Sequence, residues 1–109
     1  MRTSKAVGRR GDWFATVDGE TLPCVHQHWM HGTLYHDPHA NPGELIWNRL
    51  IDGIRTTRKV ILTSDKATKT LEGIGFERTG YIAVFEVDDI DVAGTHLRFR
   101  ITKRLQDLE

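Results

Sequence analysis

One segment of the chain concentrates side chains that bind metals or carry protons. Residues 23 to 39, PCVHQHWMHGTLYHDPH, hold five of the six histidines and the only cysteine. Alternate side chains of a strand share a face, so Cys24, His26 and His28 are expected to point the same way. With His31, His36 or His39 from the following loop as a fourth ligand, they would form a ligand set suited to zinc. The alternative to a zinc site is that these residues are polar groups on a strand face or in a pocket and bind no metal.

The spacing of these ligands does not match a closed zinc site. Structural sites usually combine two pairs of the C-x-x-C or H-x₃₋₅-H kind. We therefore expect no resident cofactor, with zinc as the alternative. Catalytic motifs such as G-x-S-x-G, a P-loop or H-E-x-x-H do not occur in the chain. Cys24 beside His26 or His28 resembles a nucleophile and its base, but neighbours on one strand face seldom reach hydrogen-bonding distance. The sequence favours a protein that is not an enzyme.

A second set of residues fits nucleic-acid binding. Arg98, Arg100 and Arg104 alternate with apolar residues in LRFRITKR and therefore share one strand face. Such a row can follow phosphates, or it can pair with the acidic residues that precede it in the chain. Trp13 and Trp29 are expected on paired strands. An exposed tryptophan there would stack on an unpaired base, whereas a buried one would belong to the core.

Length and composition restrict the class of protein. The 109 residues fit one domain, and 39% hydrophobic with 28% charged residues argue against disorder. The formal net charge is zero, so the overall charge does not indicate a nucleic acid, a membrane or any other charged partner. A single cysteine gives no internal disulfide, and no apolar run approaches the roughly 18 residues of a membrane span. We expect a cytoplasmic protein without a membrane partner, either a monomer or a weak homodimer.

The histidine-rich segment needs a hairpin and a loop to position it. Residues 1–11 contain four positive charges before the first acid and are predicted to be a flexible basic arm. Asp18-Gly19 is a strong type I′ turn signal between predicted strands at about 12–17 and 20–30. The turn formers that follow predict a loop of about ten residues, a length that is often functional.

A helix should follow this loop. Asn41 is a candidate N-cap, with a proline next to it and a glutamate three residues later. Apolar residues at helical spacing then form one stripe that includes Trp47, so this ring is expected in the core. The helix is predicted over about 42–56.

The C-terminal half reads as strands separated by loops. KVILT, residues 59–63, is a short buried strand, and residues 64–75 are predicted to be a loop. Residues 78–87 are apolar on both faces and predict a central strand. Residues 88–94 form an acidic turn, and the clean alternation of 95–105 predicts the last strand.

These elements predict one α+β domain over residues 12–105, followed by a short tail at 106–109. The expected architecture is a curled, mostly antiparallel sheet of five strands, or a small β-barrel, with one main helix.

KVILTSD, RTGYIAVFEVDDI and LRFRITKRL together resemble PUA-like domains of the EVE type. Those domains are small twisted β-barrels in which an apolar strand precedes an arginine-rich partner. The resemblance covers about the C-terminal half of the chain and implies that the mouth of the barrel binds RNA or a modified base. It assigns no individual residue.

The leading hypothesis is a small non-catalytic module that binds nucleic acid, with a tryptophan stacking on a base and the arginine row holding phosphates. One alternative is a metal-binding protein or small metalloenzyme. Another is a homo-oligomeric interaction module that associates through an exposed edge strand.

Overall fold

The turn signal at Asp18-Gly19 produces the predicted hairpin. In the computed structural model, which describes residues 3–8, 12–71 and 73–109, β2 (Phe14–Val17) pairs antiparallel with β3 (Glu20–His26). Asp18 and Gly19 have φ values of 50° and 82°, as a type I′ turn requires. The second strand is shorter than predicted, because the 3₁₀ helix η1 (Gln27–Trp29) follows His26.

The predicted loop after this hairpin is a second, smaller hairpin. β4 (Met30–His31) pairs with β5 (Leu34–Asp37), and Gly32 at φ 65° lies in the turn. β5 also pairs with the last strand of the chain. The expectation of a long loop was wrong because this pairing partner is distant in sequence.

The predicted helix exists but begins later. Helix α1 (Leu45–Thr57) has Glu44 as its N-cap and no side-chain cap. Asn41 is not the cap. Its carbonyl oxygen accepts a hydrogen bond from the Glu44 amide in a turn that precedes the helix. The apolar stripe does face the core, where Leu50, Ile51 and Ile54 are buried.

Three long strands make up most of the C-terminal half. They are β6 (Lys59–Thr70), β7 (Gly73–Ala93) and β8 (His96–Leu108). The predicted loop at 64–75 and the predicted acidic turn at 88–94 are therefore largely strand. β7 passes through the acidic segment with a bulge at Asp89, whose φ is 53°.

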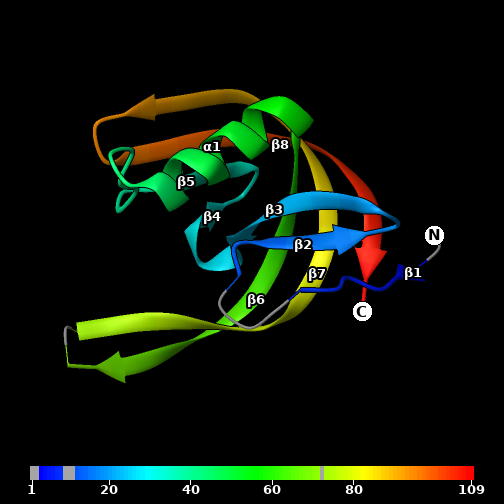
Figure 1. Cartoon of the computed structure of the whole chain (residues 1–109), viewed down its shortest axis with the longest axis horizontal. Coiled ribbons are helices and arrows are strands. Elements are labelled where there is room, and N and C mark those ends of the chain that lie inside the picture. The colour runs from blue at the N-terminus through cyan, green and yellow to red at the C-terminus, as the bar shows by residue number, and fades with distance from the viewer. Residues whose placement is uncertain (1–2, 9–11, 72) are drawn as a thin grey trace.

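The sheet contains eight described strands rather than five. Its order is β2-β3-β6-β7-β8-β5-β4, with β1 (Thr3–Ser4) joined to β8 (Figure 1). Neighbours are antiparallel except at β3/β6 and β1/β8. The fold is α+β as predicted. Because β2 and β4 end the path without pairing to each other, the sheet is curved but is not the closed barrel of the alternative expectation.

The ends of the chain pack more closely than predicted. β1 pairs with β8, Ala6 is buried, and Val7 bridges to Thr16. This part of the predicted arm is therefore ordered against the sheet, while Arg2, Arg9 and Arg10 lie outside the described residues. The predicted tail at 106–109 largely continues β8.

Alternation along β6 separates two apolar clusters. Val60 and Leu62 pack with α1, Val87, Leu97 and Phe99, whereas Ile61 packs with the β2–β3 hairpin. Both faces of this strand are therefore covered. No described helix is long and apolar enough to cross a membrane.

Beyond these clusters, the outer parts of β6 and β7 pair only with each other among the described residues. Their ladder continues from Asp65↔Arg78 to Thr70↔Gly73, whereas the pairing of β3 with β6 ends at Thr63 and that of β8 with β7 ends at Ala83 (Figure 1). The result is a two-stranded ribbon that projects from the sheet. Its base, residues 77–81, lies beside the first hairpin and the helix.

Candidate functional site

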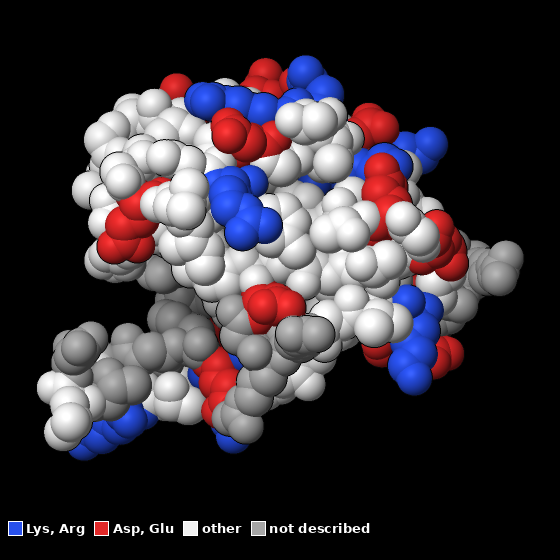
Figure 2. Space-filling model, viewed as in Figure 1, with Lys and Arg blue, Asp and Glu red and all other residues white. Residues whose placement is uncertain are grey.

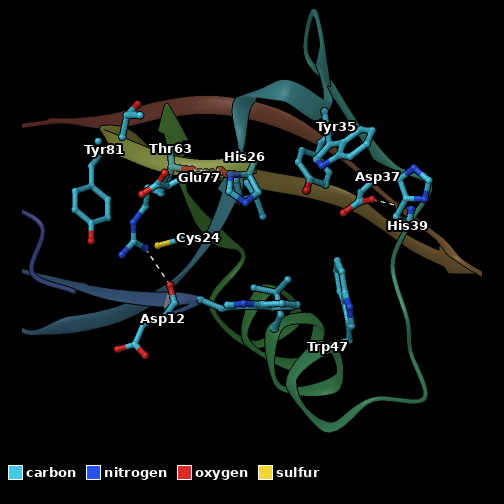
Figure 3. Close-up of a pocket in the computed structure, with 17 residues that line it drawn as sticks. Asp12, Cys24, His26, Tyr35, Asp37, His39, Trp47, Thr63, Glu77 and Tyr81 are labelled. Atoms are coloured by element: carbon cyan, nitrogen blue, oxygen red, sulfur yellow. Dashed lines mark hydrogen bonds between the residues drawn. The ribbon is translucent and has the colours of Figure 1, made fainter. Parts of the chain in front are cut away.

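A pocket of about 850 Å³ opens where the first hairpin, α1, β5 and the base of the ribbon meet (Figure 3). Five aromatic residues line its walls: Trp13, Trp29, Tyr35, Trp47 and Tyr81. Three acids, two imidazoles, one thiol and one guanidinium also line it: Asp12, Asp37, Glu77, His26, His39, Cys24 and Arg78. A volume of this size and a mostly apolar lining with a few polar groups are typical of small-ligand sites.

Contacts between rings hold the aromatic walls in place. The rings of Trp13 and Trp47 meet edge to face, with centroids 4.8 Å apart and planes at 80°. Tyr35 stacks on buried Phe99 at 4.4 Å. Trp29 lies edge-on to His39 at 5.5 Å. The three indoles are half-buried, so the site presents fixed aromatic surfaces to a flat ligand.

A carboxylate marks one end of the pocket. Figure 3 shows Tyr35, Asp37 and His39 on one side, with Trp47 across from them. Asp37 is only 5% exposed and accepts a hydrogen bond of 2.8 Å from the His39 amide. Burial raises the pKa of Asp37. Burial also raises the pKa of Tyr35 well above its usual value, and the charges of Asp37 and Asp65 add to that rise.

Asp65 stands behind His26 rather than in the pocket wall. Its side chain is 4% exposed, and its Oδ1 lies 3.6 Å from Nδ1 of His26. Among the described residues this oxygen has no hydrogen-bond partner. The Thr63 hydroxyl lies 3.5 Å from the same nitrogen of His26 and donates to the Val25 carbonyl oxygen at 3.2 Å. A buried carboxylate oxygen without a hydrogen bond is costly unless a positive charge is near.

The other end of the pocket is organised by Arg78. Its Nη1 donates to the Asp12 carbonyl oxygen at 3.0 Å, and its guanidinium carbon lies 4.9 Å from the centre of the Tyr81 ring. Burial raises the pKa of Cys24 to about 11, against a smaller opposing effect of Arg78. The thiol is therefore protonated at neutral pH, unlike the thiolate that a nucleophile requires.

This protonation state predicts slow alkylation of Cys24. Against the ordinary value of 9.0, a pKa of about 11 lowers the thiolate fraction at pH 8 about 100-fold. Iodoacetamide should label the native protein at least that much more slowly than the same chain in concentrated urea, as followed by intact-mass spectrometry. Equal rates in both states would contradict the placement of Cys24.

The four predicted metal ligands do not converge. Cys24 and His26 reach the same pocket, whereas His28 lies exposed on η1 with its ring 4.6 Å from Trp29, and His31 is exposed on β4. The alternation that should have aligned them ends where β3 gives way to η1. In the part of the chain that the structure describes, no three His, Cys, Asp or Glu residues are arranged to hold a metal ion.

The residues predicted to bind nucleic acid separate into two groups. Trp13 and Trp29 come together in the pocket. Arg98 and Arg100 flank Phe99, whose ring stacks on pocket-lining Tyr35, so these arginines face the opposite side of β8. Arg104 also lies outside the pocket lining.

The arginine row has acidic neighbours. Nε of Arg100 lies 3.6 Å from Asp89, and Nε of Arg104 lies 2.6 Å from Asp107. Figure 2 shows basic and acidic side chains interspersed on the face that it presents, without a large area of either sign. The charge pattern therefore offers no continuous track for phosphates on that face.

Several pocket residues were not predicted from the sequence. Trp47 was expected in the core, yet it is half-buried and lines the pocket. Tyr35, Asp37, Arg78 and Tyr81 attracted no functional expectation. The available signal was the number of tryptophans, three in 109 residues, all of which reach this one site.

Comparison with known proteins adds no relative. No protein-family model matches the chain, and neither the curated proteins nor the solved structures contain a match to it.

Proposed function

We propose that the protein is a non-catalytic binding module that holds one flat heteroaromatic ring, an unpaired or modified nucleobase, in the aromatic pocket. The observation that carries this proposal is the gathering of three tryptophans and two tyrosines around a cavity of about 850 Å³. Every nucleobase has a π-face, and stacking on an aromatic side chain contributes about 1–3 kcal/mol per base.

The size of the pocket suits a base with its sugar. Drug-sized ligands occupy pockets of roughly 300–1,000 Å³, and the aromatic walls account for only part of the lining. The remaining polar groups can select the edge of a base or contact its sugar and phosphate. The resemblance of the C-terminal half to PUA-like domains supports a ligand of the same class.

Phosphate contacts are a minor part of this proposal. The net charge is zero, and the arginine row on β8 faces away from the pocket. Arg78 is the guanidinium in the lining, so it is the group we assign to a phosphate beside the bound base. Affinity should therefore depend on salt much less than in proteins that follow the backbone with many cations.

A titration with matched arginine variants tests the proposal. Fluorescence anisotropy would be measured for labelled single-stranded and duplex RNA and DNA at about 50 and 150 mM salt. Arg78→Ala should weaken binding and lower the salt slope by about one. Arg100→Ala removes the same charge from the face of β8 that points away from the pocket, and it should leave the affinity and the salt slope unchanged. If about 100 μM protein forms no complex with any of these probes at the lower salt, the proposal is wrong.

A further inference from the structure

We infer that the ring bound in this pocket carries a fixed positive charge, as does a nucleobase methylated on a ring nitrogen. This inference rests on the proposed function and narrows it to one class of base. Within a nucleoside, N7-methylguanine, N1-methyladenine and N3-methylcytosine carry a positive ring charge at neutral pH, whereas their parent bases are neutral. The structure supports the inference through the shape of the aromatic walls and the position of the carboxylates.

The aromatic walls favour a cation. An aromatic ring carries negative charge on its face, and tryptophan is the strongest partner for a cation placed over it. Trp13 and Trp47 stand at 80° to each other and form a corner of the pocket. A cationic ring stacked on one of them would lie against the edge of the other. Tyr35 faces Trp47 across the cavity (Figure 3).

The carboxylates at the same end favour a cation for a second reason. Asp37 is 5% exposed and lines the pocket, and its side chain accepts a hydrogen bond from the His39 amide. Behind His26, the Asp65 carboxylate has an oxygen without a hydrogen-bond partner among the described residues. Both carboxylates are close enough to influence the hydroxyl of Tyr35. A bound cation would supply the counter-charge that their burial withholds.

The positive groups in the lining are placed so that they do not remove this preference. Nδ1 of His26 lies 3.6 Å from Asp65, and the His39 amide donates to Asp37 while the His39 ring lies edge-on to Trp29. Arg78 lies with Asp12 and Tyr81, and Figure 3 shows those two residues far from Asp37 and His39. Three carboxylates, from Asp12, Asp37 and Glu77, line the pocket against one guanidinium. This excess of acidic groups favours a cationic ring.

Matched nucleosides provide the test. Calorimetric titration would compare 7-methylguanosine with guanosine, 1-methyladenosine with adenosine, and 3-methylcytidine with cytidine. Each methylated nucleoside should bind at least about tenfold more tightly than its parent. N6-methyladenosine, which has an added methyl group but no charge, should bind like adenosine and so separates charge from methyl burial.

Two isosteric variants locate the effect. Asp37→Asn keeps the acceptor for the His39 amide but removes the charge, and it should reduce the methylated-to-parent ratio about tenfold. Asp52→Asn removes an exposed charge on α1 and should leave the ratio unchanged. If Asp37→Asn does not fold, the ratio of the affinities for methylated and parent nucleosides, measured for the unaltered protein, is sufficient to test the inference.

The outcomes separate this inference from the proposed function. Equal affinity for methylated and parent nucleosides would overturn the inference and leave base binding intact. Binding of tetramethylammonium without binding of any nucleoside or oligonucleotide would overturn both. The expected result, cationic nucleosides preferred in an Asp37-dependent way, supports both.

Discussion

Replacing Phe99 with alanine should lower the free energy of unfolding by about 3–5 kcal/mol. Phe99 is 0% exposed and lies in the cluster between the sheet and α1. Its ring stacks on Tyr35 with planes 8° apart. Truncation would leave a cavity under a residue that forms part of the pocket, so the loss combines transfer and cavity contributions. Urea denaturation followed by circular dichroism measures it.

The neighbouring residue is the matched control for this variant. Arg100 is exposed on the other side of β8, and its ion pair with Asp89 lies at the surface. Arg100→Ala should change the free energy of unfolding by less than about 1 kcal/mol. A loss below about 1 kcal/mol for Phe99→Ala would contradict the assignment of the two faces of β8.

Replacing Trp47 with leucine should weaken the binding of a base by about 1–3 kcal/mol, which is roughly 5- to 150-fold in affinity. The indole lines the pocket, where it meets Trp13 edge to face and stands across from Tyr35. Leucine retains apolar contact and helix propensity but offers no π-face. Anisotropy titration of the same oligonucleotide with both proteins measures the difference.

Ile46 provides the control for the Trp47 variant. It precedes Trp47 on α1, is 42% exposed and does not line the pocket. Ile46→Ala should therefore bind oligonucleotides as the unaltered protein does. A folded Trp47→Leu protein with undiminished affinity would show that the ring does not stack on the ligand.

Local signals in the sequence were sufficient for the elements that depend on local physics. Asp18-Gly19 predicted the turn because both residues need positive φ. The helical stripe predicted α1, and strict alternation predicted the two faces of β8, where Leu97 and Phe99 are buried and Arg98 and Arg100 are exposed. The boundaries were less accurate, since Asn41 supplies a turn carbonyl rather than a helix cap.

Non-local pairing explains most of what was missed. The outer part of β6 is polar because both faces of the ribbon are largely open to solvent, as the exposed Lys66 and Lys69 show. No alternation of apolar residues marks it, and its strand depends on hydrogen bonds to β7. β5 likewise depends on β8. Predictions from local periodicity read both segments as loops.

The candidate site was hidden for a related reason. Its side chains come from the first hairpin, η1, β5, α1 and the base of the ribbon, so no short motif contains them. Trp13 and Trp29 were predicted candidates and do reach the site, but their partner Trp47 has the same helical spacing as core residues. Asp37 belongs to the pair Asp37-Pro38, which is a turn signal and gave no indication of a pocket.

The central claim is that the pocket holds a base, and one comparison of affinities tests it most directly. Two duplexes would be used, identical except that one carries a single unpaired nucleotide and the other carries an abasic site at that position. The phosphates are the same in both, so the difference isolates the ring. If the base enters the pocket, the first duplex should bind roughly 5- to 150-fold more tightly, in line with stacking of about 1–3 kcal/mol per base. Equal affinity for the two duplexes would contradict the claim.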